Sequence, residues 1–283
     1  MATLAPPLSA RRRPAPLAAL APLGTLTRRR FALTARTPRE LLVPLLTPVL
    51  FAVVIAPALQ EALGGLRGGG SYASFVAIAT VGLLVPLNTM FSGIGVILDR
   101  ESGAQRELLA APIRRPLVVL GNLAVALAIT GLQVVVLLVA AVLRGIDFSP
   151  SATGVLWFVA GAGLLAVGMY GVAETLANRI PRQEEYVGAL PAIAIVPWFF
   201  AGSLFPIQAL PAGLTWLAKF LPLTHALALM RYGLLGDDGA GLRDIWGMSD
   251  PTVMAALSLL VLAAFAAALT AVAVRAFTRA ALR

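Results

Sequence analysis

The sequence of 283 residues contains no cysteine, one histidine (His225) and one lysine (Lys219). Without cysteine it can form neither disulfide bonds nor thiolate metal sites, and one histidine cannot supply a cluster of imidazole ligands. The phosphate-binding loop of P-loop ATPases needs a lysine directly after a glycine. Lys219 instead stands between Ala218 and Phe220. We therefore expect no catalytic residue, no metal site and no cofactor bound by this chain.

Charged residues are also scarce. They make up 12% of the sequence, whereas soluble domains have about 25%. Hydrophobic residues make up 59%, and the mean hydropathy is +0.88. Too few charges remain to cover a surface that faces water, so lipid must surround most of the chain. No polar linker separates two halves, which favours a single all-α integral membrane bundle.

Six apolar stretches approach or exceed the length of about 20 residues that a membrane-spanning helix needs. The second and third must tilt or project beyond the hydrocarbon, and the short fifth stretch is continued by apolar residues past Pro206. We expect about six transmembrane helices within a domain covering 41–274. The stretches are 41–59, 72–98, 117–143, 152–176, 189–205 and 252–274.

The distribution of arginine and lysine orients these helices. Seventeen of the 22 basic residues lie on the side of the membrane that holds both termini and the loops 99–116 and 177–188. The positive-inside rule places that side in the cytoplasm. The segment 206–251 is then extracellular. The net charge of +9 reflects this topology, and we expect no nucleic acid partner.

Both terminal segments are expected to be cytoplasmic. Residues 1–40 form a basic tail, and its part from about 23 to 40 is expected to be an amphipathic helix on the anionic inner leaflet. Residues 275–283 form a second cytoplasmic tail. Arginine-rich, alanine-rich composition is typical of a bacterial protein from a GC-rich genome, so we expect a multi-pass protein of a bacterial plasma membrane.

The cytoplasmic loop 99–116 has charges in its first half and apolar residues in its second. Its apolar residues could face one side of a short helix, with a bend at a glycine and an end at a proline. Such a segment can be a solvated turn, or it can offer contacts to a soluble partner. The residues concerned are Asp99, Arg100, Glu101, Gly103, Arg106, Glu107, Leu108, Leu109, Pro112, Ile113 and Arg115.

The segment that follows the fifth stretch is too apolar for a free loop, yet prolines prevent it from spanning the membrane. Short re-entrant or interfacial helices on the outer side are the natural solution. Trp198 and Trp216 suit the headgroup region. The residues that define this segment are Phe205, Pro206, Pro211, Pro222, Leu223 and Thr224.

Both segments resemble type-2 ABC exporter permeases. The loop 99–116 is similar to the D/E-R-E-x-G-x-x-x-E-x-L-x-x-P-I/V-x-R pattern of that family, although Arg106 stands where many relatives have glutamate. The outer segment is similar to F-x-x-G-x-x-F-P, L-P and N-P-L-T-Y/H followed by arginine, with Leu221 in place of asparagine and Arg231 as the arginine. The stretch 47–51 resembles daunorubicin-resistance-type drug-efflux members.

This resemblance implies a partner and a role for the loop. It implies that 99–116 is a coupling helix that docks on a separate ATP-binding subunit, which binds ATP and Mg. The complex would contain two such subunits and two permeases, as a homodimer or heterodimer. The expected substrate is a hydrophobic drug-like or lipid-like molecule, moved outward, and the alternative within the family is a polysaccharide or glycolipid.

Three polar residues lie within or near the expected spans: Asn88, Gln133 and Glu174. Such residues can line a transport pathway. For Asn88 and Gln133 hydrogen bonds between helices are the favoured interpretation, and for Glu174 it is snorkelling or a local ion pair near Arg179. A proton-driven transporter would need carboxylates at mid-membrane, and an intramembrane enzyme would need clustered catalytic groups. Neither pattern is present.

Overall fold

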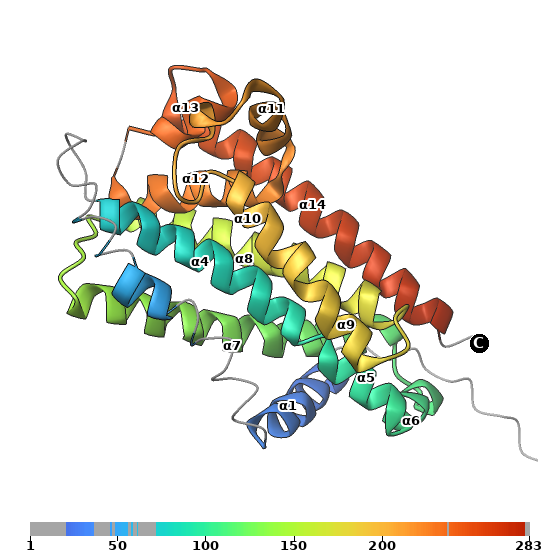
Figure 1. The fold of residues 1–283 in the computed structure, drawn as a ribbon. Coiled ribbons are helices and arrows are strands. Elements are labelled where there is room, and N and C mark those ends of the chain that lie inside the picture. Colours follow the sequence, from blue (N-terminus) through green and yellow to red (C-terminus); the bar gives the residue numbers. More distant parts are fainter. Residues whose placement is uncertain are drawn as a thin grey trace, which may run out of the picture.

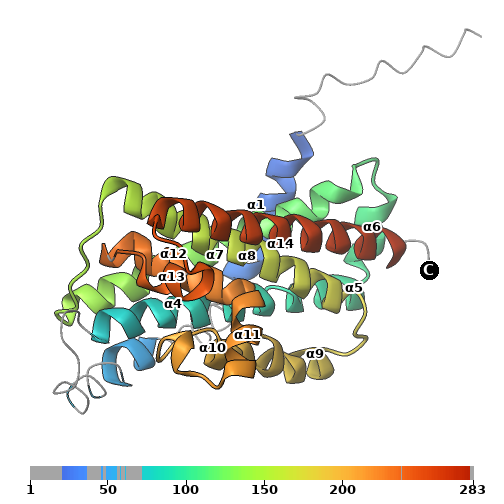
Figure 2. The same cartoon turned by 90° about the horizontal axis from the view of Figure 1, so that it is seen from above.

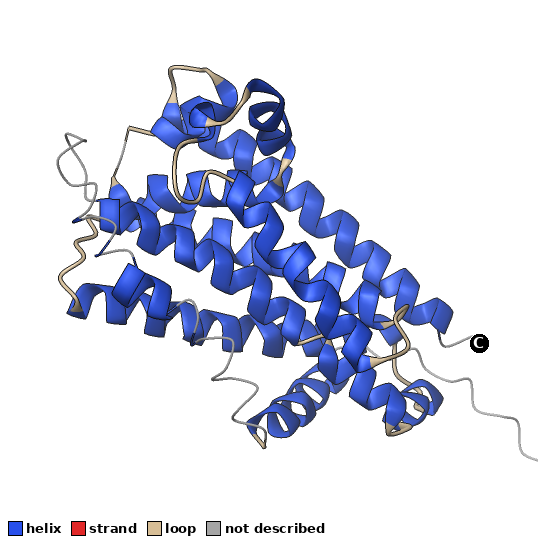
Figure 3. Cartoon of the chain, in the orientation of Figure 1, coloured by secondary structure: helices blue, strands red, loops and turns tan. Residues whose placement is uncertain are grey.

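The computed structural model describes residues 21–36, 46, 49–55, 58, 61, 72–236 and 238–280, and among these residues every regular element is a helix (Figures 1 and 3). Lipid offers no hydrogen-bond partners to the backbone, and a helix forms these hydrogen bonds within itself. The predicted all-α membrane fold is therefore confirmed. In chain order the α-helices are α1 (Ala21–Ala35), α4 (Tyr72–Phe91), α5 (Ile94–Glu101), α6 (Ala104–Ala110), α7 (Arg115–Leu143), α8 (Ala152–Ala177), α9 (Gln183–Leu190), α10 (Val196–Phe200), α11 (Ala212–Phe220), α12 (Pro222–Leu235), α13 (Ala240–Trp246) and α14 (Pro251–Ala280).

Four helical segments in the described chain are long and apolar enough to cross a membrane. They are α4 with α5 (Tyr72–Glu101), α7 (Arg115–Leu143), α8 (Ala152–Ala177) and α14 up to Arg279. These segments correspond to the second, third, fourth and sixth predicted spans.

The fifth predicted span is a composite helix. From Gln183 to Phe200 the chain passes from α9 through a π-helical segment, Pro191–Ile195, into α10. Pro191 and Pro197 lack the backbone N–H that a regular helix needs, and a π turn is one way to accommodate the interruption. The first predicted span lies mostly outside the described residues. Its π-helical part, Phe51–Ile55, lies against α4 and α7. The count of six spans stays a prediction.

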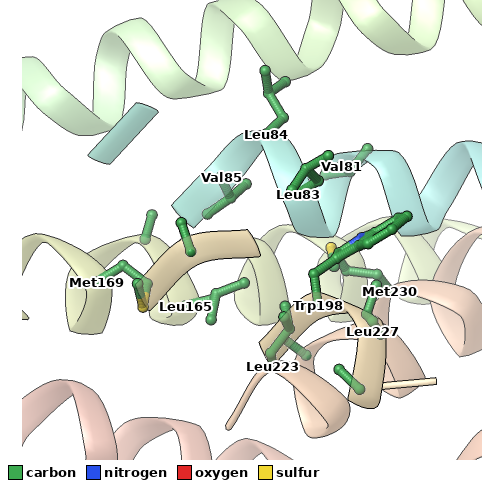
Figure 4. Close-up of a cluster of buried hydrophobic side chains, with 14 of the residues drawn as sticks. Val81, Leu83, Leu84, Val85, Leu165, Met169, Trp198, Leu223, Leu227 and Met230 are labelled. Atoms are coloured by element: carbon green, nitrogen blue, oxygen red, sulfur yellow. The ribbon is translucent and has the colours of Figure 1, made fainter. Parts of the chain in front are cut away.

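α4 is the central helix of the bundle and is buried along most of its length. It packs against α7, α8 and α12, and Figure 2 shows α14 running along α8 on the side away from α9 and α10. The apolar core lies where α4, α8, α10 and α12 meet. Figure 4 shows part of this core, with Leu84, Leu165, Trp198 and Leu227 among its members. Close packing of this kind holds helices together in lipid, where apolar side chains gain nothing by leaving the solvent.

Trp198 is a core residue rather than a lipid-facing side chain of the headgroup region. It is 2% exposed, and its indole N–H donates to the Ala79 carbonyl oxygen over 2.7 Å. A buried indole needs such a partner, and α4 supplies it. Trp216, on α11, is 65% exposed, as expected for a residue at the membrane surface.

The two ends of the bundle differ. α1, α6 and the last turns of α14 gather at one end, where Leu26, Leu108 and Phe277 share an apolar cluster, and α11 and α13 lie at the other end (Figure 1). Both ends of the described chain therefore meet at one end of the bundle, as the predicted topology requires. The outer segment forms short helices, of which α12 is the longest, at 14 residues. That length is too short to span a membrane.

Glycines on α8 allow close contact with its neighbours. A Cβ atom at Gly154 would collide with the Gly233 carbonyl oxygen of α12, and Cβ atoms at Gly168 and Gly171 would press on α14. Around Gly163, by contrast, nothing lies within 4 Å of such an atom. Gly154, Gly168 and Gly171 therefore belong to the packing surface of α8, and Gly163 does not.

Gly154→Ala should destabilise the protein by about 2 kcal/mol, because overpacking a tight backbone contact forces the helices apart. Thermal unfolding in detergent measures this loss. Gly163→Ala is the matched control, since it adds the same methyl group to the same helix in open space. Equal unfolding temperatures for the two variants would contradict the tight contact between α8 and α12.

Candidate functional site

The predicted coupling loop is a corner built from two helices. α5 ends at Glu101, the backbone turns at Gly103 with φ 77°, and α6 follows. A positive φ favours glycine, so the predicted bend at this residue is confirmed. α6 ends at Ala110, and Ala111 is extended because the residue before a proline avoids the helical region. We call residues 94–115 the α5–α6 corner.

Asp99, on α5, is buried and pairs with two arginines of α1. Its carboxylate lies 3.1 Å from Arg29 Nη2 and 3.4 Å from Arg30 Nη1. The Arg30 guanidinium also donates to the carbonyl oxygens of Gly95 and Ser92 at 3.0 and 3.3 Å. A side chain at Gly95 would occupy the place of this guanidinium. The α4–α5 junction is thus fixed to α1 by a buried ion pair.

Arg100 binds the inner end of α8. Its guanidinium donates to the carbonyl oxygens of Ala177, Ile180 and Pro181 over 2.7, 2.8 and 2.9 Å. The last carbonyls of a helix lack partners within it, and a cation also suits the negative end of the helix dipole. Asp99 and Arg100 are therefore engaged inside the chain, although the resemblance placed them on the docking surface.

The rest of the corner has a polar outer face and an apolar inner face. Glu101, Arg106, Glu107 and Pro112 are exposed, and Arg115 is partly exposed. Leu108, Leu109 and Ile113 are partly buried and pack on a cluster that includes Val119, Tyr170 and Phe277. The predicted one-sided arrangement of these apolar residues is confirmed, and the side they face is the bundle.

Sequence reasoning missed Arg29 and Arg30 as partners of Asp99. The basic residues of 23–40 predict a positive cytoplasmic side and an interfacial helix, and neither prediction names a partner for Asp99. The available signal was Asp99 itself, because an acidic residue that directly continues an apolar span needs a cation nearby. The sequence does not say which of the cytoplasmic arginines supplies it.

The environment of Glu174 differs from the predicted one. It is 0% exposed, and its carboxylate accepts hydrogen bonds from the Tyr170 hydroxyl (2.6 Å) and the Asn178 side-chain amide (3.1 Å). The predicted snorkelling or ion pair with Arg179 is therefore wrong. Tyr170 and Asn178 stand one helical turn before and after Glu174, so α8 satisfies the carboxylate locally.

Asn88 and Gln133 are both buried in the bundle. The predicted hydrogen bond between helices is wrong for Asn88, because in the described part of the chain neither its Oδ1 nor its Nδ2 has a hydrogen-bond partner.

In the outer segment, Arg231 fixes the turn after α10. Its guanidinium donates to the carbonyl oxygens of Gly202 and Ser203 over 2.8 and 2.9 Å and lies 3.4 Å from the centre of the Phe75 ring. Phe205 is partly buried and Pro206 is exposed within this turn. Pro211 and Pro222 stand where α11 and α12 begin, as suits a residue without an N–H. Leu223 and Thr224 are buried in the first turn of α12.

Hydrogen bonds within the protein hold the side chain of His225. Its Nε2 lies 3.0 Å from the Lys219 carbonyl oxygen, and its Nδ1 lies 3.1 Å from Ser258 Oγ, which accepts a bond from the Trp246 indole. A carbonyl only accepts, so Nε2 carries the proton. Burial lowers the pKa of His225, which agrees with a neutral ring. Among the described residues no group of three or more His, Cys, Asp or Glu could hold a metal ion.

Comparison with known proteins decides the family. The pattern of the family described as "ABC-2 type transporter" matches residues 22–235, which is most of the chain. The chain belongs to the ABC-2 type transporter family. The predicted resemblance is confirmed, and the matched region includes α1, the α5–α6 corner and the outer segment up to α12.

Several known proteins are similar to this chain at low sequence identity. The protein called "Putative transport permease ycf38" of Porphyra purpurea is 26% identical over 213 residues, which cover 74% of this chain and 72% of that protein. "Nodulation protein J" of Rhizobium leguminosarum bv. trifolii is 27% identical over 199 residues, covering 70% and 74%. "ABC transporter G family member 20" of Dictyostelium discoideum is 25% identical over 156 residues, covering 55% of this chain and 21% of that protein.

An ABC-2 permease is a membrane-embedded transport subunit, and membership of this family implies a partner subunit that binds ATP. The names of the ycf38 relatives describe transport permeases. This agrees with the lack of a P-loop lysine in the sequence.

The ion pair at Asp99 should contribute strongly to stability. Asp99→Asn should lower the free energy of unfolding by on the order of 3 kcal/mol, because Arg30 would keep a buried charge without a counter-ion. Chemical denaturation in detergent micelles measures the loss. Arg28→Ala, at an exposed position of the same arginine run, should change the free energy by less than about 0.5 kcal/mol. An Asp99→Asn variant as stable as the unmodified protein would refute the role of this pair.

Proposed function

We propose that this chain is the permease subunit of an ATP-driven exporter that moves a hydrophobic drug-like or lipid-like molecule out across a bacterial plasma membrane. A separate ATP-binding subunit docks on the exposed face of the α5–α6 corner. The observation that carries the proposal is the two-faced corner itself, with exposed Glu101, Arg106 and Glu107 on one side and apolar contacts to the bundle on the other.

Several contacts connect the corner directly to helices of the bundle. Leu108, Leu109 and Ile113 press on the cluster that contains Tyr170 of α8 and Phe277 of α14. Asp99 is tied to α1 and Arg100 to the end of α8. Packed interiors transmit displacement because they compress little. A movement of α6 therefore shifts α1, α8 and α14 together.

The corner also continues into the central helix. Only the turn at residues 92–93 separates α4 from α5, and α4 contacts α7, α8 and α12. Rotation of the corner would change the packing of α4 against all three. This arrangement supports a transport cycle driven through the corner. In the proposed complex the partner binds ATP and Mg, and two permeases, identical or different, assemble with two ATP-binding subunits.

The apolar character of the bundle supports a hydrophobic substrate taken from the inner leaflet. The described spans hold two buried carboxylates, Asp99 and Glu174, and both lie near the inner end of their span. Asp99 pairs with Arg29 and Arg30, and Tyr170 and Asn178 bond Glu174. A proton-coupled carrier would need a carboxylate at mid-membrane. The alternative cargo within this family, a polysaccharide or glycolipid, would need an extended polar path through the bundle.

The proposal is tested by reconstituting the permease with its ATP-binding subunit in vesicles and following ATP-dependent daunorubicin transport. Glu107→Lys should reduce transport at least about tenfold, since reversing a charge at a docking surface places like charges together. The unfolding temperature of the variant should not change, because the side chain is exposed. Glu184→Lys is the matched control, at another exposed glutamate, and should transport normally.

Three results would contradict this function. Transport by the permease alone, without nucleotide, would remove the need for an ATP-binding partner. Equal transport by Glu107→Lys and Glu184→Lys would exclude the corner as the docking site. Transport of a lipid-linked oligosaccharide but not of daunorubicin would establish the alternative cargo.

A further inference from the structure

Asn88 on α4 and Thr130 on α7 are two buried polar residues of neighbouring helices. Asn88 is 7% exposed and Thr130 is 3% exposed. The side-chain oxygen and nitrogen of Asn88, and the hydroxyl of Thr130, have no partner among the residues that the structure describes. Lipid offers no water to replace such partners, so these atoms are costly to leave unpaired.

Helix register places the two residues opposite each other. Ala77 of α4 and Ala141 of α7 share a small apolar cluster, and the two helices are antiparallel neighbours. Asn88 comes eleven residues after Ala77, and Thr130 comes eleven residues before Ala141. Eleven residues are close to three full turns of an α-helix, so each residue lies on the same helix face as its alanine and at the same level.

A second pair of residues occupies the same faces of the two helices. Leu84 and Val134 stand seven residues from Ala77 and Ala141, respectively, and both belong to the apolar core. Figure 4 shows Leu84 pointing away from Trp198 and Leu165, on the opposite side of α4. Asn88 is one turn further along the same face. The register therefore places both polar side chains on the facing sides of α4 and α7.

The neighbouring residue Thr89 shows how a buried hydroxyl in this helix is normally satisfied. Its Oγ1 donates to the carbonyl oxygen of Val85 at 2.8 Å and lies 3.1 Å from that of Pro86. Thr130 makes no such bond to its own helix, and in the part of the chain that the structure describes neither polar atom of Asn88 has a partner. Unpaired polar groups in a packed seam lower the stability of the protein, and such groups are typical of functional sites.

We propose that Asn88 and Thr130 form a polar contact for the transported molecule, which they bind through a carbonyl or hydroxyl oxygen when the seam between α4 and α7 opens. This inference rests on the proposed export of a hydrophobic molecule and adds that this molecule carries a carbonyl or hydroxyl oxygen. Asp99, which pairs with Arg30, comes eleven residues after Asn88, about three helical turns along the chain. A neutral amide and hydroxyl suit an uncharged oxygen on an otherwise apolar substrate.

The test compares two transported probes in the reconstituted complex. Daunorubicin carries carbonyl and hydroxyl oxygens, whereas tetraphenylphosphonium has no hydrogen-bonding group. Asn88→Leu and Thr130→Val should each raise the KM for daunorubicin about fivefold, the effect of losing one neutral hydrogen bond, and should leave the KM for tetraphenylphosphonium unchanged. Thr89→Val is the matched control, because its hydroxyl is already bonded within α4, and should change neither KM.

Unfolding temperatures provide a second measurement, because a purely structural role of these residues predicts a change in the opposite direction. Asn88→Leu and Thr130→Val should unfold at or above the temperature of the unmodified protein, since they remove unpaired buried polar atoms. Lower unfolding temperatures would show that these groups hold the helices together and would overturn the proposal. Equal effects on both probes, or none on daunorubicin, would also overturn it. If the unmodified complex moves neither probe, the proposed substrate class itself fails, and the inference fails with it.

Discussion

A carboxylate held away from water needs a cation beside it, and at Asp99 this need determines how the inner end of the bundle is assembled. Arg29 and Arg30 come from α1, about seventy residues earlier in the chain, and reach the end of α5. Removing Asp99 leaves the buried Arg30 without a counter-ion. The pair therefore fixes α1 across the junction between the central helix and the corner. Arg100, the next residue, fixes the same junction to the end of α8.

This construction gives the α5–α6 corner a stable inner face and leaves its outer charges free. The side chains that point into the bundle are committed to α1, α8 and α14, so they cannot also bind a partner. Glu101, Arg106 and Glu107 remain exposed. An ABC-2 permease has no ATP site in such a bundle and must receive mechanical work from another subunit. A corner that is rigid toward the bundle and polar toward water suits that transfer.

Much of the fold follows from the sequence because hydrophobicity and local backbone chemistry determine it. Apolar stretches of sufficient length predict spans, Gly103 predicts the bend and Pro112 predicts the end of α6. The side-chain partners could not be predicted in the same way. The bond of Trp198 to α4, the capping of α8 by Arg100 and the pairing of Asp99 with α1 join residues far apart in sequence. For Glu174, the missing information was the direction of the side chain, which depends on packing against the neighbouring helices.

The central claim is that an ATP-binding subunit docks on the outer face of the α5–α6 corner. The chain has no cysteine, so Glu107→Cys would introduce a unique thiol to which a photoactivated crosslinker can be attached. The claim predicts a covalent product with the ATP-binding subunit after illumination. It predicts none from Ser249→Cys, an exposed position between α13 and α14. Crosslinking from residue 249 but not from residue 107 would contradict it.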